Sequence, residues 1–200
     1  MCNSAVPVLP VEYQQVKYLQ SDGNQYFNIS NLYWHSYFDT DFEFVSFVNN
    51  AMGTQYNFNG MLGANNISGY DTKVYFSSAP KVGVYVRGTS MGSANIAANT
   101  KYNLYISSAE VKLNGATIST TTAGEITGST YCGVFACYGG ATNPPHNACA
   151  IKLYRLKSNY IDLYPCYRKS DHKPGMYDIN HDVFYTNLGT GADFTVGSNI

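Results

Sequence analysis

The chain carries little charge. Aspartate, glutamate, lysine and arginine make up 12% of its 200 residues, against roughly 25% in an average soluble domain. The formal net charge is -1. A balance this close to neutral gives no electrostatic footprint for nucleic acid or for an anionic membrane surface, so neither is expected as a partner.

The chain also lacks a long apolar run and a basic N-terminal start. No stretch approaches the ~20 apolar residues that a membrane helix needs. The first residues, MCNSAVPVLPVEY, predict no signal peptide, and therefore synthesis in a cytoplasm. An odd number of cysteines in such a chain favours free thiols, at positions Cys2, Cys132, Cys137, Cys149 and Cys166.

No triad, phosphate loop or metal-ligand cluster is recognisable. The series Cys132, Cys137, His146, Cys149 departs from the usual C-x2-4-C spacing of structural zinc, and buried thiols explain it better. Histidines fall in predicted loops without a paired nucleophile, at His35, His146, His172 and His181. We therefore expect no cofactor and no metal.

Short strand signals separated by turn residues dominate the chain, with no helical period and no internal repeat. They predict one all-β domain over residues 11–200. Residues 1–10 hold Pro7 and Pro10 and are expected to form an extended arm. Strands are predicted at 38–48, 60–64, 73–77, 81–87, 102–106, 110–113, 116–118, 130–138 and 148–156.

Two further hairpins are predicted near the ends of the chain. The first joins Val16–Leu19 to Gln25–Ile29 through a turn at Ser21–Asn24. The second joins Met176–Asp178 to Val183–Thr186 through Ile179–Asp182.

The strand before the second hairpin, at 161–164, is expected to stop at Pro165, which cannot donate to a central ladder. Side chains of the second hairpin are expected to pack against the first, namely Met176, Tyr177, Val183 and Tyr185. In the middle of the chain, Asn114-Gly115 is a strong signal for a type I′ turn.

The strand at 38–48 places Asp39, Asp41 and Glu43 on one face and Phe42 and Phe44 on the other. Three carboxylates on one face could ligate a hard cation, but neighbours on a strand face lie ~6.5 Å apart. A solvated outer face is the favoured interpretation, and cation binding there is left open.

Several phrases resemble the concanavalin A-like lectin/glucanase superfamily in its laminin G-like jelly-roll form, as found in gut-bacterial and tailed-phage proteins. The phrases are VKYLQSDGNQYF at 16–27, VKLNG at 111–115, AIKLY at 150–154, LYPCYRK at 163–169, GMYD at 175–178, VFYTN at 183–187 and GTG at 189–191. The resemblance implies a jelly-roll β-sandwich of two antiparallel sheets.

Members of this superfamily that hydrolyse glycans carry two glutamates flanking an aspartate on one strand, with carboxylates ~5 to 5.5 Å apart. None of the four glutamates lies in such a motif, at Glu12, Glu43, Glu110 and Glu125. The arginines are too scattered for sialidase chemistry, at Arg87, Arg155 and Arg168. We therefore predict that the chain is not an enzyme and has no catalytic residue.

Carbohydrate recognition uses an aromatic face for the sugar ring and planar polar groups for its hydroxyls. Loop residues of these types are candidates for glycan binding, namely Tyr33, Trp34, Tyr70, Asp71, Tyr138, Asn143 and His146. Each has a plainer interpretation as an interface aromatic or a turn residue.

The expected function is that of a non-catalytic structural or adhesion protein of a tailed phage virion, as a head decoration, head fibre or tail-associated subunit. Its expected partners are other virion proteins, bound through residues 1–10, and host-surface polysaccharide; self-association is left open. The alternative is a carbohydrate-binding lectin-like module of a gut bacterium. Depletion of charge is typical of permanent interfaces and favours the virion interpretation.

Overall fold

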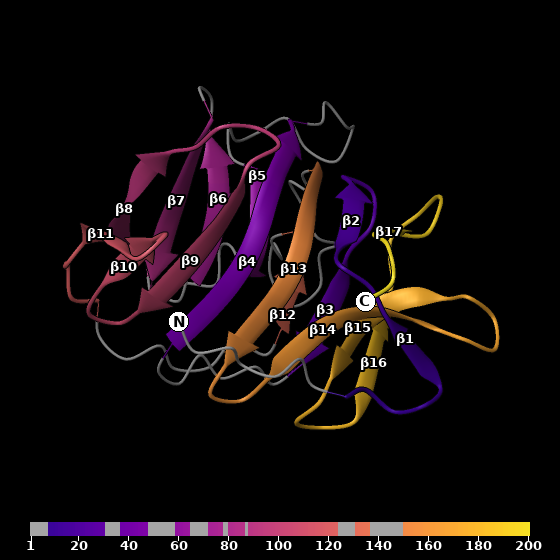
Figure 1. The fold of residues 1–200 in the computed structure, drawn as a ribbon. Helices are drawn as coiled ribbons and strands as arrows, with labels where there is room; N and C mark the ends of the chain where they lie inside the picture. The colour runs from indigo at the N-terminus through magenta and orange to yellow at the C-terminus, as the bar shows by residue number, and fades with distance from the viewer. Residues whose placement is uncertain are drawn as a thin grey trace.

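The chain is built from antiparallel strands. The computed structural model describes residues 8–30, 37–47, 59–64, 72–77, 80–86, 88–123, 131–136 and 150–200, and over these ranges it contains no helix. The all-β expectation is therefore confirmed. The described strands form two sheets that lie one behind the other (Figure 1).

The larger sheet has 11 strands and the smaller has 6. The larger follows the order β11 (Ala116–Ser119), β10 (Val111–Leu113), β9 (Lys101–Ser107), β4 (Tyr37–Ser46), β13 (Ala150–Ser158), β14 (Asp162–Arg168), β15 (Pro174–Asp178) and β16 (Val183–Thr186). Three more strands join it off this path, β1 (Tyr13–Gln15) beside β14, β2 (Leu19–Asp22) beside β13, and β17 (Thr195–Val196) beside β2. The smaller follows the order β3 (Phe27–Ser30), β12 (Tyr131–Val134), β5 (Asn59–Ala64), β6 (Thr72–Ser77), β7 (Lys81–Val86) and β8 (Thr89–Asn95).

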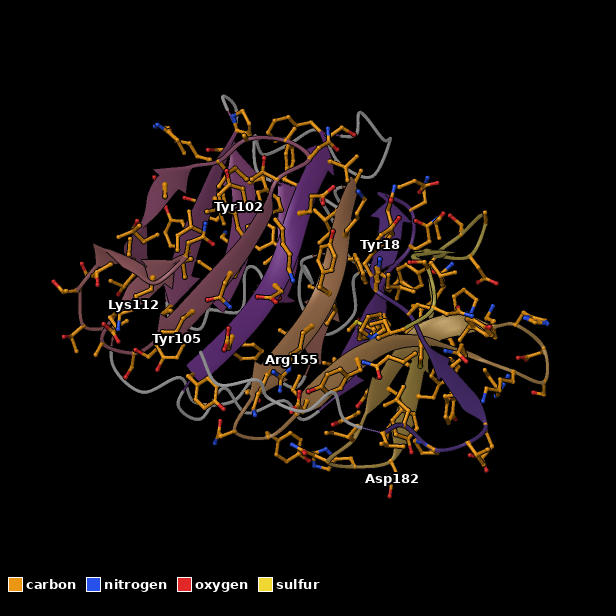
Figure 2. The ribbon with its side chains drawn as sticks, in the orientation of Figure 1. Tyr18, Tyr102, Tyr105, Lys112, Arg155 and Asp182 are labelled. Atoms are coloured by element: carbon orange, nitrogen blue, oxygen red, sulfur yellow. The ribbon has the colours of Figure 1, made fainter. Side chains whose placement is uncertain are left out.

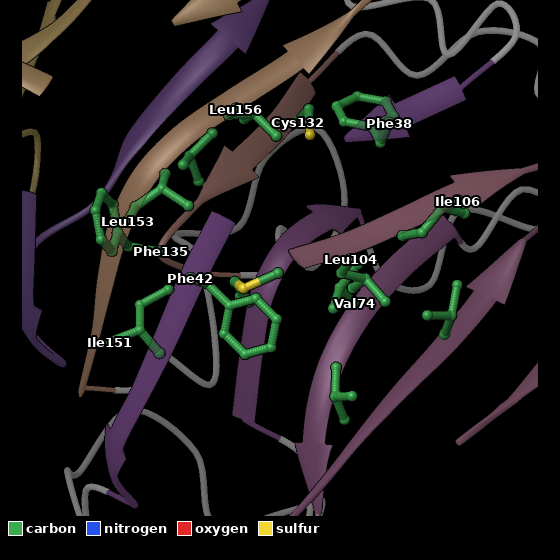
Figure 3. Packing of buried hydrophobic residues seen from close by; sticks show 14 of the residues in the cluster. Phe38, Phe42, Val74, Leu104, Ile106, Cys132, Phe135, Ile151, Leu153 and Leu156 are labelled. Carbon is green, nitrogen blue, oxygen red and sulfur yellow. The ribbon is translucent and has the colours of Figure 1, made fainter. Parts of the chain in front are cut away.

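The core lies between the two sheets, because each central strand turns alternate apolar side chains inward. Phe38 and Phe42 of β4 are fully buried, as is Phe76 of β6. The rings of Phe42 and Phe76 lie 5.6 Å apart across the layers. Figure 3 shows the interdigitation of Leu153 and its neighbours. Each fully buried side chain of this size contributes roughly 1.5–3 kcal/mol.

The lateral edges of the two sheets meet. At one side, a Cβ on Gly92 of β8 would lie 3.3 Å from the Ser119 Cβ of β11. At the other side, the ring of Phe27 from β3 stacks on Tyr185 of β16 at 5.4 Å. Edge strands covered in this way do not offer free ladders for aggregation.

The first predicted hairpin is wrong. Its turn forms, with Gly23 at φ 100° and the buried Gln25 side chain accepting the Asp22 N–H at 2.8 Å. The two strands then enter different sheets, because β2 pairs with β13 and β17 while β3 pairs with β12. The segment therefore carries the chain from one layer to the other.

The expected end of the strand at Pro165 is also wrong, because β14 continues to Arg168. Ladder bonds from β13 end at Leu163, and those from β1 begin at Cys166. Between them Pro165 accepts the Val16 N–H at 3.0 Å, so this pair keeps the one bond that proline can make. Proline is tolerated where the strand changes partner.

The second predicted hairpin is confirmed, with Met176 opposite Tyr185 and Asp178 opposite Val183. Its packing differs in part from the expectation. Met176 lies in the main core and Tyr185 contacts Phe27, as expected. Val183 is 39% exposed, and Tyr177 packs in a second cluster on the outer side of the sheet.

That second cluster lies under the N-terminal segment 8–16, which we call the strap. Its buried members are Leu9, Tyr164, Cys166 and Tyr177. The strap explains why both faces of β14 and β15 are buried, where an outer strand face would ordinarily alternate. Of the predicted arm, residues 1–7 lie outside the described ranges.

Both described cysteines, Cys132 and Cys166, are buried free thiols, as expected. Cys2, Cys137 and Cys149 fall outside the described ranges. The Asn114-Gly115 turn has φ of 50° and 78° at its central residues, which confirms the type I′ prediction.

Candidate functional site: the polar face of the large sheet

The outward side of the large sheet gathers much of the charge of this charge-poor chain. We call it the polar face and define it by Tyr18, the β4 residues Asp39, Asp41 and Glu43, the β9 residues Lys101, Asn103 and Tyr105, the β13 residues Lys152, Tyr154, Arg155 and Lys157, and Asp162 of β14. Tyr105, Arg155 and Tyr18 are spread across it in Figure 2.

Strict alternation along β4 produces part of this face, since its phenylalanines point into the core. A β-bulge in β13 produces the rest. Leu153 and Leu156 are both buried, so the two residues between them, Tyr154 and Arg155, both point outward. Bulges often re-aim side chains in this way beside functional sites.

Glu43 is the centre of one cluster on the polar face. Its side chain is only 10% exposed and pairs with the Lys152 ammonium. The Tyr154 hydroxyl donates to Glu43 Oε2 at 2.8 Å. Burial, reinforced by this hydrogen bond, raises the pKa of Tyr154 above its ordinary value, so the phenol remains a donor.

Aromatic rings and ammonium groups alternate around this cluster. Lys101 Nζ lies 4.5 Å from the centre of the Tyr154 ring, and Lys152 Nζ lies 5.1 Å from that of Tyr18. The two rings meet edge to face at 5.6 Å. The result is a cation–π ladder from β9 to the start of β2.

Asp39 and Asp41 share one donor, the Asn103 amide, at 2.6 Å and 3.0 Å. Asp41 also pairs with Lys101 at 3.1 Å. The predicted common face of the three carboxylates is therefore confirmed, and protein groups occupy it. Among the described residues no cluster of three potential metal ligands occurs.

Arg155 forms a fork of two hydrogen bonds with Asp162, at 3.0 Å and 2.8 Å. The hydrogen bond to Asp162 raises the pKa of Arg155 and more than offsets its partial burial. Lys157 approaches the same carboxylate at 3.5 Å, and the guanidinium lies over the Tyr164 ring at 5.1 Å.

A chain of contacts continues from Asp162 to the β15–β16 turn. The Asp162 N–H donates to Asp178 Oδ1 at 3.1 Å, and Asp178 is fully buried. The other oxygen of Asp178 lies 2.7 Å from His181 Nδ1, and the His181 ring stacks on Tyr160 at 4.2 Å. The turn therefore supports the residue that orients Arg155.

The polar face suits recognition better than acid–base chemistry. Its carboxylates are held by ammonium, guanidinium, amide or phenol groups, and it has as many cationic as anionic side chains. Tyrosine rings and polar groups alternate across it, which is the composition of adaptable binding surfaces. Sequence reasoning found the β4 row but missed Tyr154 and Arg155 as a pair, because alternation alone does not predict a bulge.

The predicted glycan-binding residues all lie outside the described ranges, namely Tyr33, Trp34, Tyr70, Asp71, Tyr138, Asn143 and His146. They remain predictions. Of the cysteine and histidine series considered for zinc, only Cys132 is described, and it is fully buried in the main core. His172 stacks on Tyr167 at 5.5 Å.

The part of the chain that the structure describes includes no helix of the length and apolarity needed to cross a membrane. No protein-family model matches the chain, and no curated protein is significantly similar to it.

Proposed function

We propose that the chain is a non-catalytic structural and adhesion protein of a tailed phage virion, folded as a concanavalin A-like, laminin G-like jelly roll. The observation that carries the proposal is the polar face, on which ionic groups hold one another and tyrosine rings are presented between them. Host-surface glycans are its proposed secondary ligand.

The contacts between distant phrases of the sequence support the jelly-roll assignment. The opening phrase and the closing phrase, which carry the family resemblance, bind each other. Gln25 Nε2 donates to the Ala192 carbonyl at 3.0 Å, and the Leu188 N–H donates to the Tyr26 carbonyl at 2.8 Å. Residues that resemble the family only as separate phrases thus form one structural unit.

The electrostatics of the polar face support a non-catalytic role. Retaining glycosidases need one carboxylate as nucleophile and a second as proton donor. Glu43 is held by Lys152 and Tyr154, and Asp39 and Asp41 converge on Asn103. These contacts fix the carboxylates as structural anions.

The virion assignment can be tested with antibodies raised against the purified chain. Applied to tailed particles from the sample that encodes it, they should label heads or tails in immunogold electron microscopy. Labelling confined to bacterial surfaces would instead support the alternative, a lectin-like module of a gut bacterium. Pre-immune serum is the control.

Glycan adhesion has a separate test, a polysaccharide-retention assay on purified variants. Trp34→Ala should weaken retention on host polysaccharide without lowering the melting temperature. Tyr85→Ala is the matched control, because Tyr85 is half-buried on the outward side of the small sheet, away from the polar face. Equal retention by both variants would count against the Trp34 site.

A further inference from the structure

The strap is tied to the rest of the molecule through one narrow region, the outer edge and face of β14. Backbone pairs join Tyr13 to Arg168 and Gln15 to Cys166. Lys169 contributes two more bonds, from its N–H to the Glu12 carbonyl at 2.9 Å and from Nζ to the Val11 carbonyl at 2.8 Å.

The side chains of the strap fill an aromatic groove on the same strands. Leu9 is 8% exposed in the second cluster. The Tyr13 ring lies 4.6 Å from Tyr177 and 4.9 Å from Phe184. None of these residues belongs to the main core between the sheets, so the strap is an element that can separate while that core stays packed.

Separation would leave an open strand edge beside an aromatic groove. Such an edge takes an extended peptide by β-augmentation, in which backbone bonds supply affinity and side-chain pockets supply specificity. The segment that fits this groove is known from the structure, because it is the strap itself, with a leucine and a tyrosine four residues apart.

Two apolar side chains of the strap remain uncovered. Val8 is 95% exposed and Val11 is 79% exposed, on either side of the docked Leu9. If two copies exchange straps, the two segments cross near the symmetry axis and can cover these valines against each other. Lys17, exposed just after the strap, provides the crossing point.

We propose that the strap exchanges between two copies of this chain, so that residues 8–16 of one copy occupy the β14 groove of the other. The contacts are the same in the closed monomer and in the exchanged dimer. Protein concentration therefore selects between them. This inference does not depend on the proposed function.

A single substitution can report which chain supplies the strap. Val16 and Pro165 form a hydrogen-bonded pair, so the adjacent pair, Gln15 and Cys166, is of the non-hydrogen-bonded kind. Cα atoms of such a pair lie ~4.5 Å apart, within the range of ~4.4 to 6.8 Å that a disulfide accepts. A Gln15→Cys substitution therefore allows Cys166 to be cross-linked to the strap that covers it.

The experiment uses the full chain with Gln15→Cys and with the other native cysteines, 2, 132, 137 and 149, replaced by alanine. The protein is incubated at low and at high concentration, oxidised, and separated on a denaturing gel without reductant. We expect an intrachain disulfide at low concentration and a disulfide-linked dimer as the major species at high concentration. Lys17→Cys in the same background is the control for random cross-linking.

Exclusively intrachain cross-linking at every concentration would overturn the proposal, as would dimer no more abundant than in the Lys17→Cys control. A second measurement keeps the test independent of the cysteine variants. The unmodified chain should dimerise at high concentration in sedimentation equilibrium, and Leu9→Asp, which removes the docked leucine, should abolish the dimer. An unmodified chain that stays monomeric would also overturn the proposal.

Discussion

Replacing Gly189 with alanine should separate the opening and closing phrases of the chain. A Cβ at this position would lie 1.9 Å from the backbone oxygen of Asn24, whereas real Cβ atoms essentially never come closer than 3.0 Å. Asn24 cannot simply retreat, because Ser21 and Gln25 hold its turn through hydrogen bonds of 3.0 and 3.1 Å. The two backbones must therefore move apart by about 1 Å in a closely packed region.

The cost should reach the upper end of the range for overpacking, about 3 kcal/mol. For a chain of this size that corresponds to a fall in melting temperature of roughly 6–12 °C, measured by differential scanning calorimetry. Gly191→Ala is the matched control from the same loop. Gly191 has φ 98° and no atom near its added Cβ, so alanine there costs only the backbone strain, about 1–2 kcal/mol. A Gly189→Ala variant no less stable than Gly191→Ala would refute the reasoning.

Three further predictions concern buried and charged groups. Asp178→Ala removes a fully buried carboxylate that accepts three hydrogen bonds and should cost about 3 kcal/mol in urea denaturation, whereas the exposed Asp193→Ala should change stability by less than about 1 kcal/mol; equal effects would contradict the account. Burial raises the pKa of the Cys166 thiol from 9.0 to about 12, so its contribution to stability is complete below pH 9 and is lost as pH rises toward 12; a Cys166→Ala variant with the same alkaline unfolding profile would argue against this. The hydrogen bond from Arg168 lowers the pKa of Asp171 from 3.8 to about 2, so the pair stabilises the fold above pH 3.8 and ceases to do so as pH falls toward 2; Arg168→Ala should return the pKa toward 3.8 in an NMR titration, and an unchanged value would exclude the pairing.

The sequence predicted the central strands because their side chains alternate cleanly. The row of Asp39, Asp41 and Glu43 opposite buried phenylalanines is visible in the residue pattern, and the structure places it as expected. The type I′ turn at Asn114-Gly115 is equally local, since only its own backbone decides it.

The features that sequence reasoning missed depend on contacts between distant segments. Thr89–Asn95 forms β8 although its small polar residues have little strand preference, because β7 supplies its ladder. Pro165 sits within a strand because β13 and β1 divide that edge between them. No local pattern predicts which neighbour a strand will have.

The polar face shows the same limit for the candidate site. Tyr154 and Arg155 share a face only because β13 bulges between its contacts with β4. The partner of Arg155 is Asp162, which in turn is positioned by Asp178 from a hairpin near the end of the chain. The residue types were visible in the sequence, but their assembly required the register of three strands.

The most direct test of the central proposal is the distribution of the chain across a caesium chloride gradient of particles from its source, measured by quantitative mass spectrometry. If the chain is a virion protein, its abundance will peak in the same fractions as the major capsid protein and will survive a salt wash. A chain recovered only in the soluble fractions at the top of the gradient, with capsid protein banding normally below, would contradict the account.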